Sequence, residues 1–343
     1  MSKTLEMRNS NNIEDAIIKK FGKVFVDAAD LHTAPPKVIP TTPQMDIILS
    51  GGIPEGSFCL VSGPPKLGKS SLSLHFAGNA QKIDSEFGPR KVFYFDIEGR
   101  IKIRDISCKN LDTSPEKFTL IKSTKDKIIT GEEFIAIGEE LIRNVPGAIF
   151  IFDSFSAICT QARYDANIGD RFRDDAPLLL SSFCKRISQI IPVNKSIVIG
   201  ITHRIANQGP GMKVWTEASG QKIQYQTDVK IKGTHVSPWN VGDSQIGQDV
   251  HWECETSALG PPGSKATCKL RYKEGYDEVS ELVDLCVSIG RIKKAGAWFT
   301  MFDSDGKELT KTQGAEKMRA YLCNNTDIFE QLKKSVYNDF FDV

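Results

Sequence analysis

Residues 57–78 read SFCLVSGPPKLGKSSLSLHFAG. An apolar run typical of a buried strand comes first, and a segment with helical spacing comes last. The turn between them, residues 63–70, satisfies the pattern G-x-x-x-x-G-K-[ST], in which backbone N–H groups of the loop and of the helix N-terminus surround a phosphate. The sequence therefore predicts a nucleotide-binding loop between a strand and a helix. The residues expected to bind the nucleotide are Gly63, Pro64, Pro65, Lys66, Leu67, Gly68, Lys69, Ser70 and Ser71.

Two residues of this loop have a specific expected role. Lys69 is placed to reach the β- and γ-phosphates of ATP, and the Ser70 hydroxyl is placed to ligate Mg2+. The magnesium shell also needs a carboxylate, and Asp153 ends the apolar run AIFIFD, where such an acid belongs. An alternative role for Asp153 is the N-cap of a helix in SFSAI. We expect ATP and Mg2+ as cofactors, with Ser70 and Asp153 as the metal ligands.

A candidate catalytic base follows another strand. Glu98 lies two residues beyond Asp96, at the end of VFYFDIE, where it could orient and deprotonate a water for attack on the γ-phosphate. The alternative is an ordinary surface acid. The ends of the three strands carry the phosphate loop, the base and the metal ligand, and such ends meet at the ligand-binding edge of an open α/β sheet. Together they predict a site that hydrolyses Mg-ATP.

The rest of the chain indicates an α/β fold. Short apolar runs alternate with helical segments of about 10 to 15 residues, which is the pattern of a mostly parallel sheet covered on both faces. After residue 225 the stretches TDVKIKG, VHWECET and KATCKLRYK predict a meander at the edge of the sheet. The segment from about 278 to 343 mixes helices with a possible hairpin, AWFTMFDSDGKEL, and predicts a small C-terminal domain.

A short amphipathic helix is expected near the start of the chain. Residues 11–23, NNIEDAIIKKFGK, place apolar side chains at helical spacing, with Asn12 as a plausible N-cap and Gly22 as a stop. The following segment, LHTAPPKVIPTTPQ, has four prolines and reads as an extended linker or edge segment. The apolar stripe of the helix must be buried, either on the protein's own core or on another subunit.

Composition narrows the function classes. The chain has 343 residues, and 44 Lys and Arg against 43 Asp and Glu give a net charge of +1, so nucleic-acid binding would have to come from local patches. The eight cysteines form no C-x-x-C pair and are expected to be reduced core thiols. The polar N-terminus and the short apolar runs favour a cytoplasmic protein that is neither secreted nor embedded in a membrane.

Several motifs together resemble one family. MDIILSGGIPEGSFCLVSGPPKLGKSSLSLHF, FYFDIEG, IFIFDSFSAI and ELVDLCVSIGRIKKAGAWF are similar to segments of the RecA recombinases, including the phage UvsX-type proteins. The resemblance runs in order from the N-terminal helix to about residue 330. It implies a RecA-like P-loop core at 35–277, an N-terminal oligomerisation helix and linker at 1–34, and a C-terminal α+β domain at 278–343.

The activity that this resemblance implies is ATP-dependent DNA recombination. Such a protein polymerises as a helical filament on single-stranded DNA, pairs it with homologous duplex DNA, and hydrolyses ATP at the interface between neighbouring subunits. The resemblance makes the helix at 13–21 the arm that docks on the adjacent protomer. It makes Glu98 and Lys69 catalytic, together with His203, which stands where bacterial RecA has a glutamine that senses the γ-phosphate. The expected location is the cytoplasm of a bacterium, or of an infected host cell if a phage encodes the protein.

Two segments are expected to bind DNA. The segment after His203 is rich in glycine, and residues 203–232 hold five basic against two acidic side chains, a local excess of +3. Basic residues neutralise phosphates, and an aromatic side chain such as Trp215 can stack on bases, although it could equally be a core or interface residue. Residues 164–173 match the first DNA loop of the family; Lys185, on the helix that follows, could also belong to a solvated face. The expected DNA-binding residues are Arg171, Arg173, Lys185, Arg204, Met212, Lys213, Trp215, Gly220 and Lys222.

The sequence departs from the family pattern at two places. Bacterial RecA carries two lysines that reach the neighbouring subunit's phosphates, and Thr256 and Ala258 stand at those positions here. Lys265 or Arg271 could substitute for them if the register slips. The tyrosine that stacks on adenine is also absent, because its place is taken by residues 104–105, Arg-Asp. Cross-interface activation and base recognition are therefore expected to differ.

Two other functions share much of this pattern. A hexameric helicase or motor of RecA fold would have the same loop and acids but would close into a ring. The N-terminal arm and the KAGAW segment argue against it. A DNA-binding mediator that holds ATP as a structural ligand would fit the missing lysines. Mediator or single-strand-binding proteins are possible partners of a recombinase.

Overall fold

The computed structural model describes residues 13–22, 24–25, 35–102, 106, 110–167, 175–207, 214–217, 223, 226–303 and 306–341. The chain divides into two compact units, residues 1–36 and residues 37–343. In the first unit, residues 13–21 form the expected helix. It ends at Gly22, which adopts the left-handed conformation with a φ of 84°. The N–H of Gly22 donates to the Ile18 carbonyl oxygen. The expected N-cap, Asn12, lies outside the described residues.

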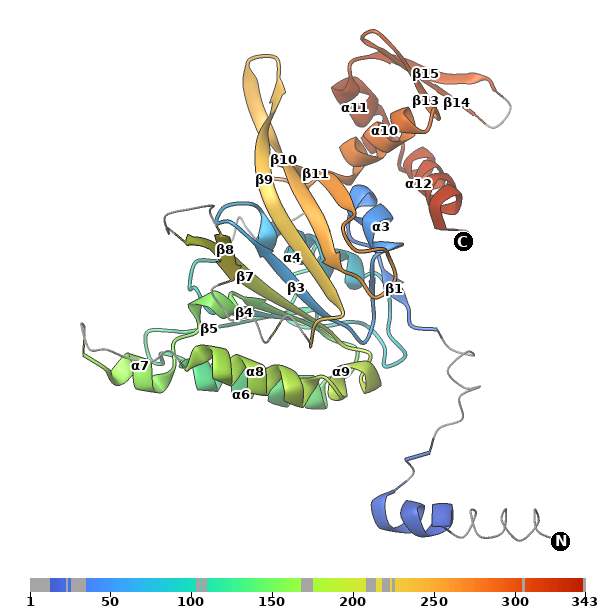
Figure 1. Ribbon diagram of the computed structural model, residues 1–343. Helices are drawn as coiled ribbons and strands as arrows, with labels where there is room; N and C mark the ends of the chain where they lie inside the picture. The colour runs from blue at the N-terminus through green and yellow to red at the C-terminus, as the bar shows by residue number, and fades with distance from the viewer. Residues whose placement is uncertain are drawn as a thin grey trace, which may run out of the picture. The chain divides into compact units, whose positions relative to one another are not determined.

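The second unit is built on a large mixed sheet (Figure 1). Its strand order is β12-β11-β10-β9-β3-β7-β6-β4-β5, and β8 pairs with β7 off this path. The six strands from β9 to β5 are parallel, which confirms the α/β class with a mostly parallel core. The strands are β3 Phe58–Gly63, β4 Val92–Asp96, β5 Phe118–Lys122, β6 Ile149–Asp153, β7 Ile197–Asn207, β8 Val214–Glu217, β9 Val229–Val241, β10 Ser244–Thr256, β11 Lys265–Arg271 and β12 Gly275–Tyr276.

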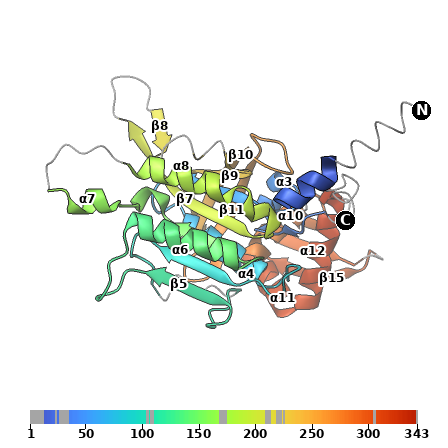
Figure 2. The same ribbon diagram turned by 90° about the horizontal axis from the view of Figure 1, so that it is seen from below.

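Helices cover both faces of the parallel part of the sheet (Figure 2). One apolar cluster joins the sheet to α4, for example through Phe76 and Ile151, and a second joins the opposite face to α6 and α8, for example through Phe152 and Phe183. This double covering explains why the parallel strands read as continuous apolar runs. The helices of this part are α3 Pro43–Leu49, α4 Lys69–Ala80, α6 Gly131–Asn144, α7 Gln161–Asp165, α8 Ala176–Ile187 and α9 Ile190–Val193. A small separate sheet pairs β1 Val38–Ile39 with β2 Ile53–Pro54.

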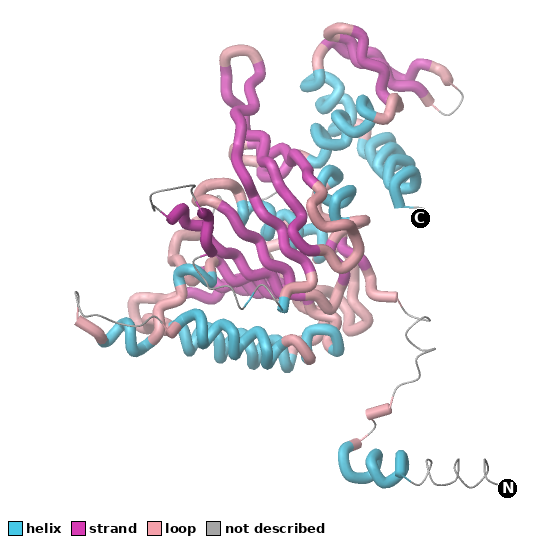
Figure 3. The backbone as a smooth tube through the Cα atoms, in the orientation of Figure 1, coloured by secondary structure: helices cyan, strands magenta, loops and turns pink. Residues whose placement is uncertain are grey.

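The remaining strands extend the sheet on one side. Strands β9, β10 and β11 pair in antiparallel order, so the predicted edge meander is confirmed. The β9–β10 hairpin stands out from the sheet, as the tube in Figure 3 shows. Trp252 of β10 is buried, whereas its neighbour His251 lies on the opposite face and stacks on His235 of β9 with ring centroids 4.0 Å apart.

The C-terminal segment has its own apolar core. Strands β14 and β15 form the predicted hairpin, and helices pack against one face of the small sheet that it belongs to. Phe299 and Met301 point into this core from the central strand. The elements are α10 Glu278–Ser288, β13 Ile292–Ala295, β14 Trp298–Phe302, β15 Glu308–Gln313, α11 Ala315–Asn324 and α12 Thr326–Phe341.

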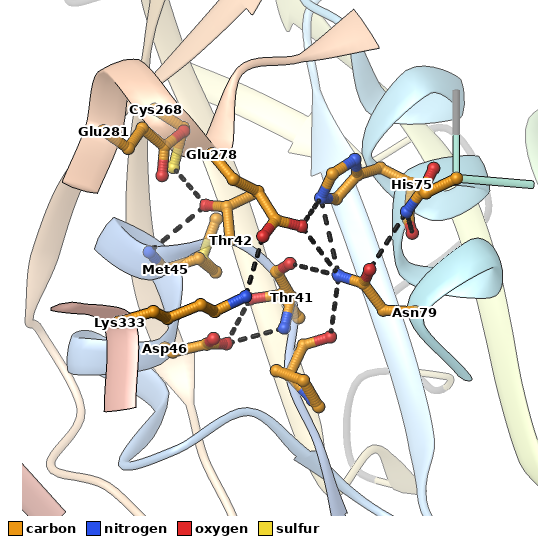
Figure 4. Close-up of polar contacts among 12 residues, drawn as sticks. Thr41, Thr42, Met45, Asp46, His75, Asn79, Cys268, Glu278, Glu281 and Lys333 are labelled. Atoms are coloured by element: carbon orange, nitrogen blue, oxygen red, sulfur yellow. Dashed lines mark hydrogen bonds and ion pairs between the residues drawn. The ribbon is translucent and has the colours of Figure 1, made fainter. Parts of the chain in front are cut away.

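A largely buried polar network joins this segment to the helices beside the central sheet (Figure 4). Glu278 of α10 contacts His75 of α4 at 2.8 Å and Lys333 of α12 at 2.7 Å. Asp46 of α3 accepts a hydrogen bond from the Tyr337 hydroxyl of α12 at 2.5 Å. These contacts connect both long C-terminal helices to the helices that flank the central sheet.

Two further sequence-based expectations have clear outcomes. The described cysteines are all free, but Cys159 and Cys323 are exposed, so the prediction that all eight are core thiols is wrong for these two. Cys159 lies in the loop region after β6, and Cys323 lies near the end of α11, where it lines an open cavity beside α4. Within the described residues, none of the helices has both the length and the apolar character needed to span a membrane.

The buried carboxyl of Asp46 predicts a pH-dependent stability. Burial raises its pKa from 3.8 to about 7. Because the folded-state pKa is the higher one, the protonated carboxyl contributes its full stability below about pH 4 and loses it as the pH rises through about 7. Asp46→Asn keeps an acceptor for the Thr41 N–H and hydroxyl and cannot ionise. The free energy of unfolding of Asp46→Asn minus that of the parent should therefore increase by about 1.4 kcal/mol for each pH unit between about pH 4 and pH 7.

Urea unfolding of both proteins at several pH values between about 4 and 8 measures this difference. Asp126→Asn, which removes an exposed carboxylate, is the control and should show no such trend. A difference between Asp46→Asn and the parent that does not change with pH would contradict the prediction.

Candidate active site

The phosphate loop connects β3 to α4 as the sequence predicts. Gly68 has a φ of 100° directly before the first residue of α4, and no side chain caps this helix. The first N–H groups of α4 therefore lack partners within the helix and can bind an anion. At Gly63 a side chain would bring a Cβ to 2.9 Å from the Gly233 carbonyl oxygen, so close backbone packing against β9 requires glycine there.

Lys69 begins α4 and lies buried under the loop. Its ammonium donates to the carbonyl oxygens of Gly63 at 3.1 Å and Pro64 at 2.8 Å, and it lies 3.2 Å from Nδ1 of His203. Burial lowers the pKa of Lys69 to about 8, although the nearby carboxylates of Asp153 and Glu98 oppose the shift. The loop thus holds a cation at the end where the β- and γ-phosphates of a nucleotide would lie.

Asp153 lies at the end of β6, within hydrogen-bond reach of the loop. The hydroxyls of Ser70 and Tyr94 both donate to its carboxylate, and burial raises its pKa. The alternative role as a helix cap is wrong, because the short 3-10 helix Phe155–Ala157 begins after Ser154 and no side chain caps it. A serine hydroxyl beside a carboxylate is the oxygen donor set that Mg2+ prefers, so Ser70 and Asp153 fit this ion.

Glu98 faces the cleft rather than the solvent. One of its oxygens, Oε1, contacts Nε2 of His203 at 2.6 Å and accepts from the Ser154 hydroxyl at 2.7 Å. The hydrogen bond from His203 lowers the pKa of Glu98 to about 2, although partial burial opposes the shift. Only 17% of its side chain is exposed, so the alternative of a surface acid is wrong. Glu98 is therefore an ionised proton acceptor held in a fixed position.

His203 connects Lys69 to Glu98. Its backbone N–H donates to the Ser156 hydroxyl at 2.8 Å, which fixes the end of β7 near the 3-10 helix. Its Nδ1 faces the ammonium of Lys69 and its Nε2 faces the carboxylate of Glu98. An ammonium has only donors and a carboxylate only acceptors, so this network assigns the ring proton to Nε2 and leaves Nδ1 as an acceptor.

A cavity of about 640 Å3 contains these groups. Its polar end holds Lys69, Asp153, Glu98 and His203, and its apolar lining includes Ile101, Leu270 and Tyr272. This volume is in the range of nucleotide-sized ligand sites. Of the predicted loop residues, Gly63 and Pro64 do not line it; those that do are Pro65, Lys66, Leu67, Gly68, Lys69, Ser70 and Ser71.

Sequence reasoning missed several residues that line this cavity or contact its lining residues. Tyr94 was detectable, because it lies two residues before Asp96 on the same buried strand and therefore on the same face. Ser154 and Tyr272 carried no separate signal, since each reaches the site only through the pairing of distant strands. Arg100 lies in the loop after β4, two residues beyond Glu98, and belongs to no motif that would indicate a role in the site.

The predicted DNA-binding residues fall mostly outside the described chain. Lys185 is exposed on α8, while its neighbour Arg186 pairs with Glu139 of α6 at 2.8 Å. The Nε of Arg204 is buried without a hydrogen-bond partner in the described chain. Trp215 belongs to strand β8, and its side chain lies outside the described part of the structure. Outside the described residues lie Arg171, Arg173, Met212, Lys213, Gly220 and Lys222.

The structure describes the positions at which two family lysines are missing, Thr256 and Ala258, and the two residues that could replace them. Strand β10 ends at Thr256, and Ala258 follows in the turn. Arg271, one possible substitute for the missing lysines, is engaged within the chain by Asp277 at 2.7 Å and Glu316 at 2.8 Å. Lys265, the other, begins β11 and is exposed. Positions 104–105 lie outside the described residues.

Near its end, β10 carries acids rather than lysines. Glu253 lies 3.5 Å from the ammonium of Lys232, and Glu255 lies 3.2 Å from the same ammonium. Glu255 also pairs with Lys230 at 2.8 Å. These charges on β9 and β10 balance one another.

Comparison with known proteins places this site in a family context. The family model of the RecA N-terminal domain matches residues 10–277, and that of the RecA C-terminal domain matches residues 280–340. A protein named Protein RecA from Caldanaerobacter subterraneus is 26% identical, over 98% of this chain and 94% of the relative. Proteins of the same name from Saccharopolyspora erythraea and Streptomyces coelicolor are also 26% identical, over 93% of this chain and 89% and 82% of the relatives.

The arrangement around His203 predicts one tautomer. Nitrogen NMR of protein with 15N-labelled histidine should show a proton on Nε2 and a hydrogen-bonded acceptor at Nδ1, with His203→Gln used to assign the signals. In Lys69→Ala the Nδ1 signal should move toward that of a free acceptor, because the ammonium is its donor. The Nε2–H signal should remain. A proton found on Nδ1 in the parent protein would contradict the assignment.

Proposed function

Because the chain belongs to the RecA family, we propose that it is an ATP-dependent DNA recombinase that forms filaments on single-stranded DNA and exchanges strands with homologous duplex. The observation that carries this proposal is the match of both RecA domain models along one chain whose predicted phosphate loop, Glu98 and Asp153 line one cavity. We propose the organisation given by the sequence: an oligomerisation helix and linker at 1–34, the ATPase core at 35–277 and the C-terminal domain at 278–343.

The cleft supports hydrolysis of ATP. The loop N–H groups and Lys69 would bind the triphosphate, and Glu98 would orient a water beside the γ-phosphorus and accept its proton. The water oxygen forms a bond to that phosphorus, and the bond to the β–γ bridging oxygen breaks with its electron pair leaving on ADP. When bound, Mg2+ would neutralise charge on the phosphate oxygens, held by Ser70 and Asp153.

His203 would link the nucleotide to DNA. It lies between Lys69 and Glu98, and the chain continues from it through Arg204 into the proposed DNA-binding segment. A γ-phosphate would attract the ammonium of Lys69 and so change the partners of His203. The sequence-predicted basic and aromatic residues of that segment, Trp215 among them, would then grip single-stranded DNA.

A strand-exchange assay tests this function. The full chain with ATP and Mg2+ should exchange a circular single strand with homologous linear duplex and should not act on heterologous duplex. Lys69→Ala should be inactive and should form no nucleotide-dependent filaments in electron micrographs, because the cation that contacts the phosphates is gone. Closed rings in place of open filaments would favour the hexameric motor, and strand exchange by Lys69→Ala would contradict the proposed link between nucleotide and polymer.

Glu98→Gln should separate binding from hydrolysis. The amide keeps the shape of the side chain but cannot accept a proton, so DNA-stimulated phosphate release should fall about 100-fold to 10,000-fold while filaments with ATP persist. Glu86→Gln removes an exposed acid outside the cleft and is the control. Unchanged phosphate release in Glu98→Gln would instead favour a mediator that binds ATP as a structural ligand.

A further inference from the structure

Arg100 lies in a turn that is anchored to the active site. Its backbone N–H donates to one carboxylate oxygen of Asp96 at 3.0 Å, and that of Ile101 donates to the other at 3.3 Å. The preceding N–H groups of Ile97 and Glu98 donate to the Asp153 carbonyl oxygen at 2.8 and 3.2 Å. The backbone at Arg100 is therefore tied to the two strand ends that carry the candidate metal ligand and base.

The side chain of Arg100 reaches the catalytic end of the cleft. It lines the cavity of about 640 Å3 and also a smaller cavity of about 440 Å3 beside it. The two cavities share Pro65, Glu98, Arg100 and His203. Tyr272, at the apolar end, lines only the larger one. Arg100 thus stands where the γ-phosphate and the attacking water would be.

Stability does not explain this position. The guanidinium lies 3.6 Å from Oε2 of Glu98, but 84% of the Arg100 side chain is exposed. An ion pair with so exposed a partner contributes little to folding. It also has a cost for catalysis, because a cation beside a general base weakens that base. The arrangement becomes useful if the arginine turns to another anion when the substrate is bound.

The charges of the cleft identify that anion. Among the described residues that line the larger cavity, the cations are Lys66, Lys69 and Arg100, and they face the acids Asp96, Glu98 and Asp153. A triphosphate adds several negative charges to this set. During hydrolysis charge is spread over the γ-phosphate oxygens, and cations placed there stabilise it.

We propose, on the basis of the ATPase function proposed above, that Arg100 is a further catalytic residue: its guanidinium leaves Glu98 when ATP binds and contacts the γ-phosphate within the same subunit. It transfers no proton or electrons. It would compensate the charge that develops on the γ-phosphate oxygens. A cation from this chain would then act in place of the two lysines that Thr256 and Ala258 replace.

Selective binding of the γ-phosphate tests this assignment. The full chain is titrated with ATPγS and with ADP, each with Mg2+, in the parent and in Arg100→Ala, Arg100→Lys and Lys317→Ala. Arg100→Ala should bind ATPγS about tenfold to 100-fold more weakly while its affinity for ADP changes less than about twofold. Arg100→Lys should recover part of the loss. Lys317→Ala removes an exposed cation of α11 and should behave like the parent.

Turnover and pH profiles give the second measurement. DNA-stimulated phosphate release by Arg100→Ala should fall at least as far as its affinity for ATPγS. If Arg100→Ala has the same ratio of ATPγS affinity to ADP affinity as the parent, the assignment is overturned. A shifted pH–rate profile with an unchanged ratio would also overturn it, because Arg100 would then only modulate Glu98. If the parent itself releases no phosphate, the proposed ATPase fails, while the affinity ratio still decides the role of Arg100.

Discussion

The register of the parallel strands determines the geometry of the cleft. Gly63 at the end of β3 is paired with His203 of β7, and Asp96 of β4 is paired with Asp153 of β6. Four chain segments that are far apart in the sequence therefore end at the same edge of the sheet. A slip of one residue between any two strands would turn the side chains of one of them to the other face and separate the groups. The apolar side chains buried on both faces prevent such a slip.

At this edge of the sheet, the contacts of Lys69 determine which groups His203 and Glu98 face. Lys69 is buried, and its ammonium is satisfied by two loop carbonyls and by His203. Phosphate oxygens would compete with these acceptors for the same ammonium. Since His203 also holds Glu98, a change in the contacts of Lys69 alters the surroundings of the base without any movement of the sheet.

Much of the fold and part of the site were predictable, because they depend on local patterns. The loop at 63–70, the alternating strands and helices, the meander and the C-terminal hairpin each leave a sequence signal that is read within about 20 residues. Asp153 and Glu98 were predictable because parallel strands end at one edge. By contrast, Tyr272 reaches the cavity only because β11 pairs with β10 far along the chain. Arg100 lies close to Glu98 in the sequence, but its place depends on the hydrogen bonds that hold the turn after β4, which no spacing rule reports. The exposure of Cys159 and Cys323 likewise depends on what covers their elements.

The C-terminal domain contacts α4, the helix that begins at the phosphate loop. Lys69 and His75 both belong to α4, about 9 Å apart along its axis. His75 contacts Glu278 of α10, which also binds Lys333 of α12. Burial opposes the charge of Glu278, but the hydrogen bond from His75 and the nearby Lys333 hold its pKa below the ordinary value.

A partly buried carboxylate between two donors tolerates little displacement, because the loss of either donor leaves part of its charge uncompensated. If the N-terminus of α4 moves when a nucleotide is bound, either the helices α10 and α12 move with it or this pair breaks. The C-terminal domain is therefore not an independent appendage. Its position is tied to α4, the helix whose N-terminus would face the phosphates.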